Sequence, residues 1–166
     1  MSAVVRTRAA LLVVLHIGLI GWAVLPAASA SVSAPDARSE ASFVSDINAA
    51  RTSRGMSGLQ VAADLVADAR EHAEAMASQQ RMFDDPALTS HVQGGQAVAE
   101  NSGEGPSVDS VNAAFMASPS HRDIILGPYS QVGVGVVWTG STLWVAEVFR
   151  QPFPSAQAQP TPTTAA

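Results

Sequence analysis

The chain of 166 residues contains no cysteine. Disulfide cross-links and thiol chemistry are therefore excluded, and stability has to come from a hydrophobic core. Lysine is absent as well, so that all nine basic residues are arginines, and they are outnumbered by 14 acidic residues. A chain with so few positive charges lacks the basic surface that nucleic acids and anionic lipid surfaces require of a partner. No internal repeat is visible.

The first 30 residues have the pattern of a secretory signal peptide. Arg6 and Arg8 precede an apolar run from Ala9 to Leu25, and Ala28-Ser29-Ala30 has the A-x-A form of a cleavage site. We expect cleavage after Ala30 and secretion of the remaining chain. The alternative is an uncleaved leader that serves as a membrane anchor. Removal of the leader takes away two arginines and no acid, so the net charge changes from −5 to −7.

Composition predicts three segments after the leader. Residues 31–40 are expected to be a short linker, and residues 41–151 a single domain with enough length for one core. Residues 152–166 are rich in proline, glutamine, threonine and alanine, which predicts a disordered tail.

Hydrophobic periodicity predicts helices at the front of this domain and a hairpin at its end. The expected elements are a helix from an N-cap at Ser39 to Arg54, a helix over 62–80, a long loop over 81–107, a helix from Pro106 to Ser118, and strands over 132–137 and 141–150. This order indicates an α+β fold. In the first strand, Gly133 and Gly135 alternate with valines, so one face is bare and would let a helix or another backbone approach closely.

A turn with a histidine connects the last helix to these strands. Pro119 ends the preceding helix, Ser120 is a candidate N-cap with Asp123 three residues later, and His121 follows at the start of a helical turn. A histidine fixed between a proline turn and a buried turn is well suited to a binding site.

The chain resembles bacterial members of the CAP superfamily, also called SCP-domain proteins (cysteine-rich secretory proteins, antigen 5 and pathogenesis-related proteins). The resemblance covers residues 41–150, and the segments that carry it are 46–51 (DINAAR), 90–91 (SH), 99–101 (AEN), 118–126 (SPSHRDIIL), 132–136 (VGVGV) and 144–149 (WVAEVF). It implies an α-β-α sandwich with a central antiparallel sheet and a cleft.

In the resembled family, the cleft holds two histidines and two acids that can bind a divalent metal. His91, Glu100 and His121 match three of these positions, whereas the fourth acid has no counterpart near Ser118. Two imidazoles and a carboxylate suit Zn²⁺ with an open position for water, so a weakly bound zinc or other divalent metal is a hypothesis for this trio. The alternative is that His91 and Glu100 hold a long loop in place through hydrogen bonds without any metal.

Three other polar groups are candidates for a role in chemistry, Glu147 and the serines for catalysis among them, and a role in chemistry is the less favoured interpretation of each. His72 borders an apolar helical face and is expected to be a hydrogen-bonded boundary residue. Glu147 lies in mid-strand, where a buried carboxylate needs a partner, and Arg122 or Arg150 could supply one. Ser118 and Ser120 adjoin His121, but neighbours in sequence rarely form a catalytic relay, and no G-x-S-x-G motif is present.

The resemblance and the residues together favour a secreted, non-catalytic binding module. Its cleft, with His91, Glu100 and His121, would take a small apolar or lipid-like ligand, or a weakly held divalent metal. One alternative is a metal-assisted hydrolase of peptide or cell-envelope substrates, in which Glu100 would act as the general base. No other residue is assigned a catalytic role. Another is a protein–protein interaction module that uses residues 93–105.

Overall fold

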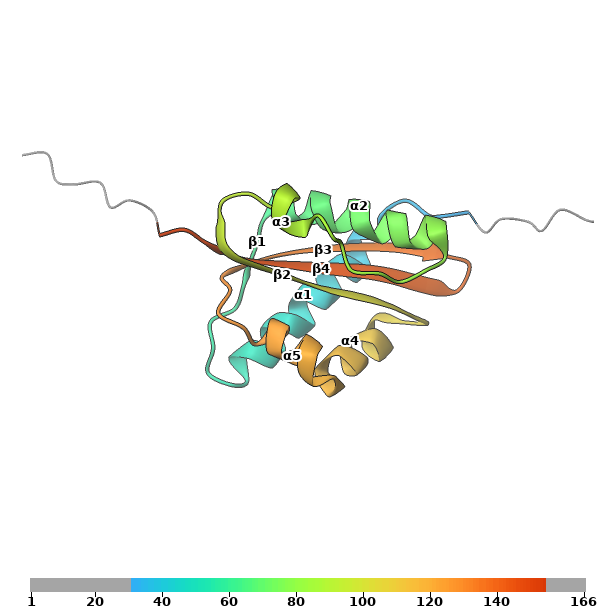
Figure 1. Ribbon diagram of the computed structural model, residues 1–166. Coiled ribbons are helices and arrows are strands. Elements are labelled where there is room, and N and C mark those ends of the chain that lie inside the picture. Colours follow the sequence, from blue (N-terminus) through green and yellow to red (C-terminus); the bar gives the residue numbers. More distant parts are fainter. Residues whose placement is uncertain (1–30, 155–166) are drawn as a thin grey trace, which may run out of the picture.

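The computed structural model describes residues 31–154, which fold into a four-stranded sheet with helices on both faces (Figure 1). The elements in chain order are α1 (Ala37–Thr52), β1 (Gln60–Val61), α2 (Ala63–Gln79), α3 (Leu88–His91), β2 (Gly95–Gly105), α4 (Val108–Ala117), α5 (Pro119–Ile125), β3 (Gln131–Thr139) and β4 (Thr142–Pro152). The signal-peptide prediction and most of the predicted tail lie outside the described residues. Within the described part, no helix has the length and apolarity needed to cross a membrane.

The strand order is β1-β3-β4-β2. β3 and β4 form an antiparallel hairpin, and β2 pairs antiparallel with β4 on its other side. The two-residue β1 pairs parallel with the start of β3. The sheet is thus antiparallel except at β1, and the α-β-α sandwich expected from the sequence is present.

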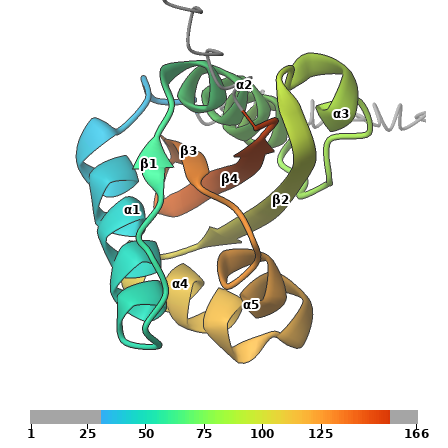
Figure 2. The same cartoon turned by 90° about the vertical axis from the view of Figure 1, so that its left-hand side faces the viewer.

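Helix α2 covers one face of the sheet, and α1, α4 and α5 cover the other, as the end-on view in Figure 2 shows. Each interface has its own core. The α1/α4/α5 side is filled by Phe43, Ile47, Phe115, Ile125 and Phe149, and the α2 side by Leu65, Ala69, Met76, Trp144 and Val148.

The bare glycine face of β3 lies directly under α2. A Cβ atom on Gly133 would come within 2.1 Å of the backbone of Leu65, and one on Gly135 within 2.2 Å of the backbone nitrogen of Arg70. The close helix approach predicted from the glycine spacing is therefore confirmed.

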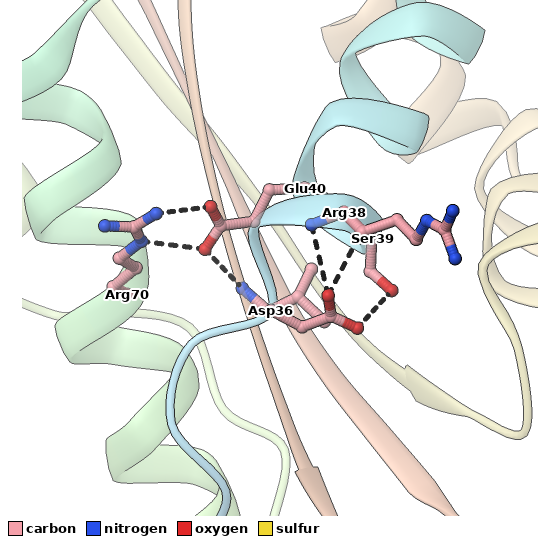
Figure 3. A network of polar contacts seen from close by, with 6 residues as sticks. Asp36, Arg38, Ser39, Glu40 and Arg70 are labelled. Atoms are coloured by element: carbon pink, nitrogen blue, oxygen red, sulfur yellow. Dashed lines mark hydrogen bonds and ion pairs between the residues drawn. The ribbon is translucent and has the colours of Figure 1, made fainter.

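The beginning of the domain differs from the prediction. Residues 31–40 are not merely a linker, because Ser33 and Asp36 hydrogen-bond to the backbone of β3 and α1 already begins at Ala37. The N-cap is Asp36 rather than Ser39: its carboxylate accepts the backbone N–H groups of Arg38 and Ser39 (Figure 3). Four hydrogen bonds lower the pKa of this carboxyl group, that from the Ser39 hydroxyl most strongly.

The long loop expected over 81–107 is wrong in its second half. Residues 95–105 form β2, an edge strand that pairs with β4 along its whole length. The loop was predicted because this segment is rich in glycine. Gly103 instead allows close packing, since a Cβ there would lie 2.6 Å from the Phe115 ring. The cap predicted at Ser120 is also wrong, because α5 starts two residues earlier, with Ser118 as N-cap and Pro119 in the first turn.

Candidate functional site

A buried histidine–carboxylate pair joins α2 to β2. The Nδ1 atom of His72 lies 2.5 Å from Oε1 of Glu100, and both side chains are less than 10% exposed. The second oxygen of Glu100 accepts the backbone N–H of Asp85 at 3.0 Å. Burial by itself would lower the pKa of His72, but the hydrogen bond to Glu100 and the charge of that carboxylate outweigh it and raise the pKa. Both oxygens of Glu100 are thus occupied by partners from the protein.

His91 stands at the rim of a small acidic pocket next to this pair. It is the last residue of α3, about half exposed, and its Nδ1 lies 3.3 Å from the Asp85 carboxylate. The pocket has a volume of about 130 Å³. Its lining residues are Asp68, Glu71, His72, Ala75, Phe83, Asp85 and His91.

His121 lines a different cavity, which opens between α4, α5 and the end of β2. Its ring packs edge-on against Phe115, with ring centroids 5.0 Å apart. The cavity has a volume of about 230 Å³ and a largely apolar wall. Its lining residues are Met82, Ser102, Gly103, Glu104, Val111, Ala114, Phe115, Ser118 and His121.

The three residues proposed as metal ligands therefore do not converge. His91 and His121 line separate cavities, and Glu100 is held by His72 and Asp85. Between residues 31 and 154, no group of three or more histidine, aspartate and glutamate side chains is placed to hold a metal ion. The geometry of this trio does not fit the zinc site that the resemblance implies.

Glu147 differs from the sequence prediction in its partner. Its side chain is fully buried, and Oε2 accepts a hydrogen bond of 3.1 Å from Asn101, not from an arginine. Arg150 instead binds Asp64 and Gln131, and Arg122 reaches the carbonyl of Met116. Burial raises the pKa of Glu147 to about 8, against a smaller opposite effect of the Asn101 hydrogen bond. The carboxyl group is accordingly protonated at neutral pH.

The Asn101 amide also fixes α5. The same nitrogen that bonds to Glu147 lies 3.3 Å from the backbone carbonyl of His121. The asparagine of the Ala-Glu-Asn segment thus connects the central strand β4 to the residue that lines the apolar cavity.

The sequence did not reveal the hydrogen-bond partners of two buried residues, His72 and Arg51. His72 is the partner of Glu100, which helical periodicity could not reveal because the two residues are 28 positions apart. Arg51, in the last turn of α1, is buried and donates to the carbonyls of Ser57, Ile125, Gly127 and Tyr129. The one indication of this role in the sequence is that Arg51 falls on the apolar face of an otherwise amphipathic helix.

Helices on both faces of a small, mainly antiparallel sheet, with clefts beside the edge strand β2, define an α+β sandwich of the CAP type. The family model described as "Cysteine-rich secretory protein family" matches residues 44–148. The chain therefore belongs to the CAP family.

Solved structures agree with this fold. An outer surface protein from Borrelia burgdorferi superposes with a TM-score of 0.65 at 16% identity, covering 72% of this chain and 98% of that one. A cysteine-rich secretory protein from Staphylococcus aureus gives 0.60 at 21% identity, with 69% of this chain but 39% of that protein covered. Venom allergen-like protein 4 from Schistosoma mansoni gives 0.59 at 8% identity, with 72% and 92% covered. A search among curated proteins found no significant match.

Proposed function

We propose that this CAP domain is an exported, non-catalytic binding module whose cleft beside His121 takes a small apolar or lipid-like ligand. The observation that carries the proposal is the wall of that cleft. Apolar side chains from α4 and from Met82 surround a space of about 230 Å³, and the polar groups in the lining belong to Ser102, Glu104, Ser118 and His121. Ligand sites commonly combine a mostly apolar wall with a small number of polar groups that fix orientation.

The surroundings of Glu100 support binding over hydrolysis. A hydrolase needs a carboxylate or imidazole that can reach the substrate or its attacking water. Glu100, the residue considered as a base, is buried and accepts hydrogen bonds from His72 and Asp85. For the alternative of an interaction surface over 93–105, residues 95–105 form the edge strand β2, which pairs with β4 on one side only, so a protein partner would contact its outer edge.

Export is supported by the leader pattern and by the descriptions of other proteins that have the same fold. Structures with the same fold come from proteins described as an outer surface protein, a secretory protein and an extracellular protein. These descriptions belong to those proteins, and they agree with the signal peptide expected over residues 1–30.

A titration of the domain with 1-octanol, followed by amide chemical shifts in NMR spectra, tests the ligand proposal. We expect saturable shifts at Gly103 and Ala114, which line the cleft. Ala114→Trp should fill the cleft and weaken binding at least tenfold. Ala113→Trp is the matched control, because Ala113 is an exposed alanine of the same helix that does not line the cleft. Equal binding by both variants would refute the proposal, as would octanol shifts spread over the surface.

A further inference from the structure

The outer edge of β3 is covered at its two ends by different segments. At the beginning, Gln60 and Ala62 donate backbone hydrogen bonds to the carbonyls of Ser130 and Val132. Towards the other end, the backbone of Asp36 donates to the carbonyl of Val136, and Ser33 pairs with Trp138. Val134 lies between these two covered stretches.

The peptide groups of Val134 face the gap. In an antiparallel ladder, consecutive residues direct their N–H and C=O groups alternately towards one neighbour and the other. Val136 and Trp138 bond outward, away from β4, and Val134 has the same parity. Within residues 31–154, no hydrogen bond from outside the β3–β4 ladder reaches its N–H or C=O. Buried backbone groups without a partner are rare, so we expect the N–H and C=O of Val134 to form hydrogen bonds with a bound molecule.

A cavity of about 370 Å³ opens at this position between α1 and α2. Its lining residues are Ala37, Glu40, Ala41, Val44, Val61, Val66, Arg70 and Val134. Most of them are small aliphatic residues, and Val61 at the rim is 58% exposed, which is unusual for a valine beside a core. The space exceeds the volume of one or two water molecules, and its polar groups are those of Glu40, Arg70 and the Val134 peptide.

The charged pair in the wall determines whether the cavity accepts a charged ligand. Arg70 of α2 binds both oxygens of Glu40 on α1, at 2.8 and 2.6 Å (Figure 3). A Glu40 oxygen also accepts the N–H of Val136 at 3.4 Å. The arginine charge is therefore neutralised within the protein. A carboxylate ligand would face the Glu40 carboxylate and the Val134 carbonyl, and both would repel it.

We propose that this groove binds an extended peptide segment, in which one residue with a small aliphatic side chain pairs with Val134. A single extended residue presents an N–H and a C=O on the same side, so it can complete both missing hydrogen bonds, as an added strand does. Longer pairing is blocked because the edge groups of Val132 and Val136 are occupied. The site is separate from the His121 cleft, so the two proposals stand or fall independently.

N-acetyl-L-valine methylamide is the smallest probe with this chemistry. In an NMR titration of the mature domain, we expect saturable shifts centred on the Val134 amide. The matched probe replaces the valine N–H by an ester oxygen and keeps the shape. It should bind at least tenfold more weakly, because the Val134 carbonyl would then remain without a donor.

A pair of variants locates the binding. Ala41→Leu places a larger side chain in the groove and should weaken binding of the amide at least tenfold. Ala113→Leu, at an exposed alanine of α4 outside the groove, should leave it unchanged. A spectrum otherwise like that of the wild type shows that each variant is folded.

Three results would overturn the proposal. Equal binding of amide and ester would mean that the cavity takes apolar groups without pairing to β3. Equal binding by the two leucine variants would place the probe elsewhere. A Val134 amide that does not shift at saturating probe would mean that the groove holds water only.

Discussion

The carboxyl group of Glu147 on β4 and the amide of Asn101 on β2 face each other across the strand pair, with Oε2 and Nδ2 3.1 Å apart. Among residues 31–154 the second carboxyl oxygen has no hydrogen-bond partner, and the side chain is fully buried. Through its bond to the His121 carbonyl, the Asn101 amide also connects this core carboxyl group to the backbone of α5.

Stability should therefore fall as the pH rises through neutrality. The pKa of Glu147 is about 8 in the folded chain, against an ordinary value of 4.5 for a glutamate. Between these values the folded state binds more protons than the unfolded state, so the contribution of this group declines as the pH increases. The full effect is roughly 5 kcal/mol, at 1.36 kcal/mol per pKa unit. The raised pKa of His72 acts in the same direction above pH 6.5.

Urea unfolding of wild type and Glu147→Gln at pH 5 and pH 8 measures this contribution. Glutamine keeps an acceptor for Asn101 but does not titrate. We expect the variant to lose most of the difference between the two pH values and to be the more stable protein at pH 8. An identical pH dependence in both proteins would show that Glu147 does not titrate in this range.

Arg51 should be one of the most sensitive polar positions. Its guanidinium group connects the end of α1 to the carbonyls that follow α5, namely those of Ile125, Gly127 and Tyr129. Lysine cannot reproduce this fork of donors, and carbonyls left without a partner in a buried place are costly. We expect Arg51→Lys to reduce the free energy of unfolding by about 2–4 kcal/mol.

Arg54→Lys is the control for that substitution. Arg54 lies one turn later on the exposed side and reaches the carbonyl of Ala50 and the hydroxyl of Ser53. Its replacement should change the free energy of unfolding by less than about 0.5 kcal/mol. Similar losses for both variants would mean that the four carbonyl contacts of Arg51 contribute little.

The sequence was informative where a local pattern determines the structure. The alternating glycines of β3 indicated a close helix, and the strand patterns over 132–137 and 141–150 indicated the hairpin, in which Gly140 has a φ of +58°. β2 was missed because its stability comes from pairing with β4 rather than from its own glycine-rich sequence. Which acid meets which base also depends on the fold: Arg150 binds Asp64, 86 positions away, and leaves Glu147 to an amide.

Isothermal titration with Zn²⁺ at pH 7.5 tests the metal hypothesis against the geometry. Because His91 and His121 line separate cavities and Glu100 is occupied, we expect no zinc site that depends on all three residues. His91→Ala and His121→Ala should give the same heats as wild type. Micromolar binding that is lost in both variants would show that the domain rearranges to bring the trio together.

Processing of the leader can be checked by the intact mass of the exported protein. We expect a chain that begins at Ser31, directly before Val32, which pairs with Thr139. The double substitution Ala28→Leu and Ala30→Leu removes the small residues that the cleavage site requires. The precursor of this variant should remain uncleaved. A wild-type product that retains Arg6 and Arg8 would support a membrane anchor instead.

Gly133→Ala should destabilise the fold strongly for so small a change. The added methyl group would lie 2.1–2.4 Å from backbone atoms of Leu65 and Val66, which cannot move without shifting α2. Overpacking of this kind typically costs about 1–3 kcal/mol, and backbone obstruction places this site at or above the upper end. Gly58→Ala is the comparison, since its Cβ would meet the Asn48 side chain at 3.2 Å and needs a shift of a few tenths of an ångström. Thermal and urea unfolding of both variants should therefore rank Gly133→Ala well below Gly58→Ala. A Gly133→Ala protein as stable as wild type would mean that α2 can move away from β3 at little cost, and that the glycine face is not required for the close contact.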